Sequence, residues 1–143
     1  MGRREQGYTP GTPCWVDLTT PDVEGAIAFY GDLHGWTVRE VMDGAYWYFE
    51  HDGAVVGGLS PLGDAQREAG MPPAWSMYVR VADATSTLAH AEALGGRATF
   101  GPREIPGAGA MAAVADPQGG VTLLWEPGPF AGAEVVNEVG AWC

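Results

Sequence analysis

The chain has 143 residues, 46% of them hydrophobic, which is enough for one domain with a buried core. Eighteen acidic residues against seven basic ones give a formal net charge of −11, which disfavours binding to nucleic acid or anionic membranes. The sequence contains neither an apolar run long enough to span a bilayer nor an apolar signal segment, and its two cysteines do not indicate a disulfide framework. We therefore expect a cytoplasmic protein.

The first predicted elements follow a short N-terminal segment, residues 1–12, in which we expect a flexible arm. Residues 13–19 alternate between apolar and polar side chains, as in a half-buried strand. A helix is predicted next, with Thr20 as its cap, Pro21 in the first helical position and Gly35 as its end. Three short strands are then predicted, at residues 36–41, 45–50 and 54–59.

A second copy of this order begins near Trp75. It comprises a predicted strand over 75–81, a helix capped by Asp83 and ended by Gly95, and strands at 97–100, 111–115 and 121–125. We therefore predict a single domain, 13–128, built of two βαβββ modules at 13–62 and 73–128, with a polar linker at 63–72. One such module has unpaired sheet edges, so the two copies are expected to pair.

Three features of this pattern resemble the vicinal oxygen chelate superfamily, which includes glyoxalase I, extradiol dioxygenases and the fosfomycin- and bleomycin-resistance proteins. They are the repeated βαβββ order, the helix end Phe29-Tyr30 to Gly35-Trp36, and Asp116-Pro117-Gln118-Gly119 before the last strand. Residues 14–22 and 75–78 are most similar to its actinobacterial hydroxylase-like, or 27-kDa-antigen-like, branch. The resemblance implies an α+β fold in which two tandem βαβββ modules form a U-shaped, curved mixed sheet with helices on the convex side.

The C-terminal residues 129–143 have two interpretations. Members of this branch often carry two such domains in tandem, and the stretch 137–143, Asn-Glu-Val-Gly-Ala-Trp-Cys, resembles the opening of the second one, cut short. The alternative is an arm that packs on the sheet edge or on a partner subunit. Relatives pair their modules within one chain or between two chains, so the resemblance leaves both a monomer and a homodimer open.

The resemblance also implies where a metal ion would bind. Metalloenzymes of the superfamily place His, Gln or Glu at four inward positions, on the first and last strand of each module. The matching positions here hold Trp15, Gly58, Ser76 and Leu124, none of which is a strong ligand for a divalent ion. We therefore expect no metal and no other cofactor. A metal-dependent lyase or dioxygenase with ligands elsewhere, such as Glu50 and His51, is kept as an alternative.

Strand alternation predicts which side chains line the cavity of this fold. Trp15, Asp17 and Thr19 share the inward face, and alternation alone does not decide whether Tyr46 and Tyr48 or their neighbours in the same strand line its rim. An apolar, aromatic pocket with few polar groups is typical of small-molecule sites. The predicted ligand-binding residues are Trp15, Thr19, Tyr48, Val56, Gly58, Ser76, Tyr78, Thr122, Leu124 and Glu126.

These residues favour a metal-independent protein that binds a small hydrophobic, aromatic natural product, for antibiotic sequestration, self-resistance or assistance in biosynthesis. The second hypothesis is a metal-free biosynthetic enzyme, a cyclase, isomerase or hydroxylase-like catalyst. In it, Asp17 or Glu126 would be the base and Tyr78 the general acid or oxyanion donor, while Arg80 would pair with Asp17 and orient the ligand. The competing interpretation is structural: the aromatic residues would belong to the core, and Asp17 and Arg80 would form an ion pair that links the two modules.

Overall fold

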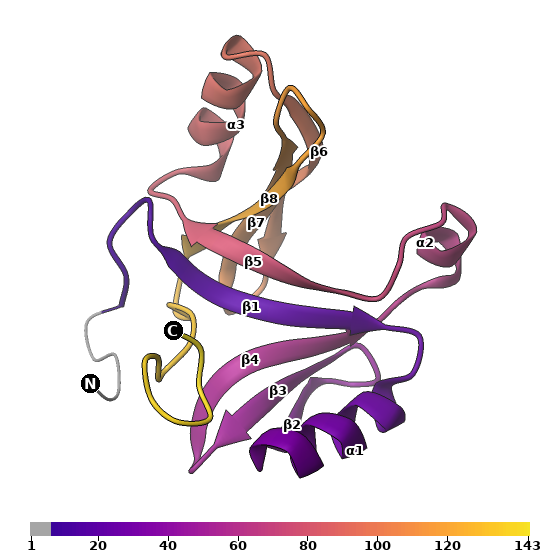
Figure 1. Cartoon of the computed structure of the whole chain (residues 1–143). Coiled ribbons are helices and arrows are strands. Elements are labelled where there is room, and N and C mark those ends of the chain that lie inside the picture. Colours follow the sequence, from indigo (N-terminus) through magenta and orange to yellow (C-terminus); the bar gives the residue numbers. More distant parts are fainter. Residues whose placement is uncertain (1–6) are drawn as a thin grey trace. The chain divides into compact units, whose positions relative to one another are not determined.

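The computed structural model describes residues 7–143 and divides into two compact units, each built around one βαβββ module (Figure 1). The first unit comprises Trp15–Ser76 and Ala133–Cys143, and the second comprises residues 7–14 and Met77–Gly132. The predicted α+β class and repeated element order are confirmed. Residues 1–6 of the predicted arm lie outside the described residues. Within the described part, none of the helices has the length and apolar character needed to cross a membrane.

The first unit has a four-stranded mixed sheet in the order β2-β3-β4-β1. β1 pairs with β4 in parallel, and β3 pairs with β2 and β4 in antiparallel fashion. A short helix, α2, lies within the segment predicted as a linker. The elements are β1 (Pro13–Thr20), α1 (Val23–His34), β2 (Thr37–Met42), β3 (Tyr46–His51), β4 (Ala54–Pro61) and α2 (Asp64–Glu68).

Helix α1 begins two residues later than the sequence predicts. Asp22, not Thr20, is the N-cap, and its carboxylate accepts a hydrogen bond from the backbone N–H of Gly25 at 2.9 Å. Thr20 instead accepts a hydrogen bond from the Asp22 backbone N–H. The predicted end is confirmed, because Gly35 adopts a left-handed φ of 71° that a glycine takes without steric cost.

Helix α1 covers one face of the first unit's sheet. Its residues Val23, Ile27 and Tyr30 pack against a buried cluster that includes Leu18 and Phe49, both no more than 6% exposed. Because side chains alternate along a strand, the neighbours of these residues in β1 and β3 point to the opposite face. The sheet of the first unit therefore has one helix-covered face and one face without a helix of its own.

The C-terminal segment Ala133–Cys143 packs on the first unit. The Glu134 backbone N–H donates to the Val55 carbonyl at 2.8 Å, and the Glu134 carboxylate accepts from the Val55 N–H at 3.0 Å. Val135 is buried in the same cluster as Leu18, and the Trp36 Nε1–H donates to the Gly140 carbonyl. This segment thus completes the core of a module from which it is distant in sequence.

The second unit repeats the arrangement, with strand order β5-β8-β7-β6 and β5 parallel to β8. Asp83 caps α3 as predicted, accepting from the Ser86 N–H at 2.7 Å, and Leu88 of α3 is buried against β7 and β8. β6 runs past its predicted end at Phe100, because shifts in its register with β7 accommodate Gly101 and Pro102. The elements are β5 (Ala74–Arg80), α3 (Ala84–Ala93), β6 (Arg97–Ile105), β7 (Gly109–Ala115) and β8 (Val121–Pro127).

Candidate functional site

The face of the first unit without a helix carries a chain of hydrogen-bonded side chains. The Trp15 Nε1–H donates to the Tyr46 hydroxyl at 2.9 Å, and that hydroxyl donates to Asp17 Oδ2, also at 2.9 Å. Trp15 is 6% exposed and Asp17 is 5% exposed, whereas Tyr46 is only partly buried. The Tyr46 hydroxyl thus links the indole of Trp15 to the carboxyl group of the buried Asp17.

A glycine in β4, Gly58, leaves room for these hydrogen-bonded side chains. Gly58 pairs with Asp17 on one side and with Tyr48 on the other. A Cβ atom at position 58 would overlap the Tyr46 hydroxyl and would lie 2.6 Å from Tyr46 Cζ. The Tyr46 hydroxyl therefore fills the volume that a side chain at 58 would occupy.

Three aromatic rings line the same face. The Tyr48 ring meets Trp15 edge-on, with centroids 5.6 Å apart, and meets Tyr46 edge-on at 6.1 Å. The Arg39 guanidinium lies 5.3 Å from the Tyr48 ring centroid and forms a 2.7 Å ion pair with Glu50. Burial raises the pKa of Tyr48, against the opposing effect of the Arg39 charge, so this hydroxyl stays protonated at neutral pH.

The tertiary structure shows which aromatic residues of β3 lie on the same face as Trp15. Trp47 and Phe49 pack with the cluster beneath α1, which leaves Tyr46 and Tyr48 on the face that carries Trp15. Tyr46, which the sequence offered only as one of two alternatives for the rim, joins Tyr48 on this face. Strand β3 is aromatic on both faces, so its sequence contains no contrast from which the orientation of Tyr46 could be read.

Two predicted polar residues lie near this face. Thr19 Oγ1 and Ser60 Oγ are 3.4 Å apart, within hydrogen-bond distance, on the paired strands β1 and β4. Ser76 follows Trp75, whose indole donates to the Tyr30 hydroxyl on the α1 side. Alternation therefore directs Ser76 to the face opposite α1. Their part in ligand binding stays a prediction.

The face predicted for Val56 is wrong, because β4 carries a bulge. Phe49 pairs with Gly57, yet the next residue, Glu50, pairs with Val55, so one residue of β4 has no partner in the ladder. This extra residue reverses the alternation. Val56 is consequently fully buried in the cluster beneath α1, although Gly58, two residues later, faces Tyr46.

The face predicted for the β8 residues Thr122, Leu124 and Glu126 is also wrong, because the alternation along β8 is shifted by one residue. Tyr78 pairs with Leu123 and Arg80 pairs with Trp125, so these four side chains share a face. Leu124 instead packs in the cluster beneath α3, and alternation places Thr122 and Glu126 on that side with it.

The sequence gives no signal for this register, since β8 is apolar at successive positions. Glu126 has a local role, in which its Oε1 accepts from the Ala84 N–H at the start of α3 at 2.8 Å.

The remaining predicted residues, Tyr78 and Arg80, belong to the second unit. The Cys14 thiol donates to the Tyr78 carbonyl at 3.6 Å. Burial raises the pKa of Cys14 to about 11, partly offset by the charge of Arg80. Asp17 belongs to the first unit, so the pairing of Asp17 with Arg80 stays a prediction.

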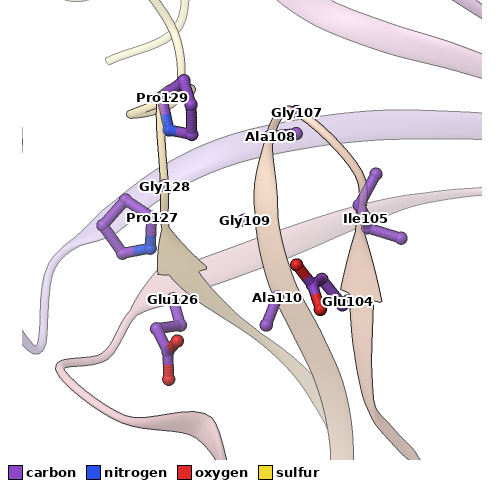
Figure 2. Close-up of a pocket in the computed structure, with 10 residues that line it drawn as sticks. All are labelled: Glu104, Ile105, Gly107, Ala108, Gly109, Ala110, Glu126, Pro127, Gly128 and Pro129. Carbon is purple, nitrogen blue, oxygen red and sulfur yellow. The ribbon is translucent and has the colours of Figure 1, made fainter.

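The second unit also has a pocket of about 390 Å³ where the β6–β7 hairpin meets the end of β8 (Figure 2). Its polar side chains are two carboxylates, the exposed Glu104 and Glu126, which is the one predicted site residue among its walls. Backbone forms much of the remainder. The lining residues are Glu104, Ile105, Gly107, Ala108, Gly109, Ala110, Glu126, Pro127, Gly128 and Pro129.

The chain belongs to the glyoxalase/bleomycin resistance protein/dioxygenase superfamily, whose family model matches residues 14–123. The anthracycline biosynthesis protein DnrV of Streptomyces peucetius is 35% identical over 94% of this chain and 54% of its own length. "Putative glyoxylase CFP32" of Mycobacterium tuberculosis is 34% identical over 98% of this chain and 54% of its own length. The chain thus spans about half the length of these curated relatives.

Solved structures support the same fold. Methylmalonyl-CoA epimerase from Mycobacterium tuberculosis aligns with a TM-score of 0.60 at 18% identity, covering 87% of this chain and 95% of the epimerase. The Mn(II)-bound glyoxalase from Novosphingobium aromaticivorans aligns with a TM-score of 0.58 at 18% identity, covering 96% of this chain and 44% of the glyoxalase. At this level of identity the similarity establishes the fold alone.

The residues of the first unit do not fit the divalent metal that this family implies. Asp17, which pairs with Gly58 at one of the family's metal positions, already accepts a hydrogen bond from Tyr46. Position 58 has no side chain, and the Tyr46 hydroxyl takes up the space where a ligand would project. Within residues 7–143, no three His, Cys, Asp or Glu side chains gather as a metal would require.

Proposed function

We propose that this protein binds a small, hydrophobic, aromatic natural product without a metal ion, in antibiotic biosynthesis or in sequestration of the product. The binding surface is the face of the first unit that carries Trp15, Tyr46 and Tyr48. The observation that carries the proposal is the combination of three aromatic rings with one buried, hydrogen-bonded carboxylate on a sheet face without a helix. On this face the partly exposed rings of Tyr46 and Tyr48 would contact a ligand, with Trp15 and the Asp17 carboxylate buried behind them.

The names of the relatives support an aromatic ligand. Two of them, from Streptomyces peucetius and Streptomyces strain C5, are named as anthracycline biosynthesis proteins. Anthracyclines are planar fused-ring molecules, which suits edge and face contacts with tyrosine and tryptophan. The net charge of −11 further favours a neutral or cationic molecule over an anionic one. We include a homodimer in the proposal, in which a second copy would complete the binding surface.

Native mass spectrometry of the freshly purified protein, with elemental analysis of the same sample, tests this proposal. We expect a co-purifying aromatic molecule that is released on unfolding. Its occupancy should fall when Tyr48 is replaced by alanine. The matched Phe100→Ala variant, which removes an exposed ring from β6 of the second unit, should retain it. Near-stoichiometric zinc, iron, manganese or nickel would overturn the metal-free proposal.

Metal-free catalysis is the second candidate function. The observation that favours it is the hydrogen bond between a buried carboxylate and a tyrosine hydroxyl, a pair suited to proton transfer. Asp17→Asn separates the two candidates once a ligand is known. Loss of turnover with binding retained would support an enzyme, and binding without turnover in the unmodified protein would support sequestration.

A further inference from the structure

We propose that the pocket between the β6–β7 hairpin and the end of β8 is a second binding site, which takes the ammonium group of a small organic amine. The pocket belongs to the second unit, whereas the proposed aromatic face belongs to the first, so the inference goes beyond the proposed function. Its volume of about 390 Å³ lies in the range of small-molecule sites.

Strand register places two carboxylate side chains on one face of the sheet, on either side of an alanine. Glu104 of β6 pairs with Ala110 of β7, and Ala110 pairs in turn with Glu126 of β8. Residues that pair directly share a face, so these three side chains form a row across the sheet. Figure 2 shows the Glu104 carboxylate directed towards Ala110, with Glu126 on the other side of that alanine. The small methyl group of Ala110 thus leaves the space between the two carboxylates open.

Both carboxylates can accept hydrogen bonds from a ligand. Glu104 is exposed and has no hydrogen-bond or ion-pair partner within residues 7–143. Glu126 is partly buried, and its Oε1 accepts from the Ala84 N–H, which leaves Oε2 for a ligand. Among the described residues that line the pocket there is no Lys, Arg or His. A cation supplied by a ligand would therefore meet no competitor from the pocket walls.

The backbone part of the wall is held in place by short-range contacts. The Ala108 carbonyl accepts from the Gly128 N–H at 2.9 Å and from the Phe130 N–H at 3.1 Å. A Cβ atom at Gly109 would overlap the Glu126 carbonyl oxygen, so the two strands approach backbone to backbone at this point. The hairpin is thus fixed against the segment that follows β8, and the pocket is formed before a ligand enters.

The chemistry of the walls selects the class of ligand. Two carboxylates favour a positive charge between them, and a primary ammonium has three N–H donors to share between their oxygens. A divalent metal ion needs more converging ligands, and within residues 7–143 no three His, Cys, Asp or Glu side chains gather. The rings of Pro127 and Pro129 and the Ala110 methyl group offer apolar contacts to a hydrocarbon body. Small organic amines combine these two features.

Three probes of nearly equal shape test the inference: cyclohexylmethylamine, cyclohexylmethanol and cyclohexanecarboxylate. Each is titrated into the isotope-labelled full chain at neutral pH and low salt, and the amide NMR signals are followed. We expect the amine to shift the signals of Gly107, Gly109 and Gly128, which line the pocket. We expect it to bind about ten-fold more tightly than the alcohol, the effect of roughly one charge-assisted hydrogen bond, and the carboxylate to bind most weakly.

Four variants locate the effect. Glu104→Gln and Glu126→Gln keep the side-chain size and should each lower the affinity for the amine about ten-fold; a glutamine at 126 can still accept from the Ala84 N–H. Ala110→Val narrows the gap between the carboxylates without changing the charge, and should also weaken binding of the amine. The matched control is Glu92→Gln, which removes an exposed charge from α3 outside the pocket and should leave the affinity within about two-fold.

Several outcomes would overturn the inference. They are equal affinities for amine and alcohol, an affinity for the amine that survives both Glu104→Gln and Glu126→Gln, and signal changes confined to residues outside the pocket. A loss in Glu92→Gln as large as that in Glu104→Gln would indicate attraction by the net charge alone. Displacement of the amine by calcium, at an ionic strength where sodium has no effect, would indicate a metal site instead. Each of these results would leave aromatic binding by the first unit standing.

Discussion

Replacing Gly58 with alanine tests whether the candidate site depends on the absence of a side chain on β4. Its backbone lies outside the left-handed region, so alanine is compatible with the conformation itself. The added methyl group overlaps the Tyr46 hydroxyl, whereas the next nearest residue, Asp17, has its Cβ at 3.0 Å. Tyr46 must therefore move, and its hydrogen bonds with Trp15 and Asp17 must break.

The size of the effect follows from these two hydrogen bonds. A hydrogen bond to a charged group contributes about 1.5–3 kcal/mol, and one between neutral groups contributes about 0.5–1.5 kcal/mol. Alanine restricts the unfolded chain more than glycine does, which returns about 0.4–1 kcal/mol. We therefore expect Gly58→Ala to lower the free energy of unfolding by about 2–3 kcal/mol.

The assay is urea unfolding of a double-mutant cycle with Tyr46→Ala. In the Tyr46→Ala background the methyl group no longer meets the tyrosine, so Gly58→Ala should be within about 1 kcal/mol of neutral, giving a coupling of about 2 kcal/mol. The control is Gly57→Ala, whose added Cβ would lie no closer than 3.3 Å to its nearest neighbour, Val16. An equal cost for Gly58→Ala in both backgrounds would refute the reasoning.

Four further predictions concern residues other than the hydrogen-bonded Trp15, Tyr46 and Asp17. Trp142→Phe should cost less than about 1 kcal/mol in urea unfolding, because it removes a buried indole N–H that lacks an acceptor within the described residues; a loss of 3 kcal/mol or more would contradict this. At pH 8 one thiol, Cys143, should react quickly with a disulfide reagent and Cys14 only after unfolding, because Cys14 is buried with its pKa raised to about 11. Since the folded state holds the Cys14 proton longer than the unfolded chain, stability should fall as pH rises from 9.0 towards that value, and Cys14→Ala should flatten the decline. Hydrogen bonds from Ser86, that of the backbone N–H first, lower the pKa of Asp83. The stabilisation from this carboxylate should therefore be present above pH 3.8 and be lost as the pH falls through the pKa of the folded state. Asp83→Asn should weaken this dependence of stability on acid pH, and an unchanged profile would contradict the prediction.

Much of the fold could be predicted because its signals are local. Alternation in β1 correctly directs Leu18 to the core and Trp15 and Asp17 to the opposite face. Glycine at position 35 ends a helix, and Asp83 starts one, by interactions within a few residues. The misassigned cap of α1 is a small error of the same kind, since Thr20 and Asp22 are both good cap residues and lie two positions apart.

The candidate site was predicted only in part, because side chains from different strands meet through register. The prediction gave Val56 the wrong face, because the bulge in β4 depends on how β3 and β4 pair. Leu124 was placed on the wrong face because β8 is apolar at adjacent positions, so only its pairing with β5 fixes the alternation. The sequence could not decide whether Tyr46 and Tyr48 line the rim, because β3 is aromatic on both faces.

By itself, the sequence determined the two βαβββ modules, the turns between their strands, the family, and the absence of strong metal ligands at the positions expected for that family. Tertiary structure alone decided that the Tyr46 hydroxyl occupies the space left by Gly58, and that Val135 completes the core of the first unit. The reason is physical. Caps, turns and alternation depend on neighbours within a few residues, whereas strand register and long-range packing depend on which distant surfaces bury one another most favourably.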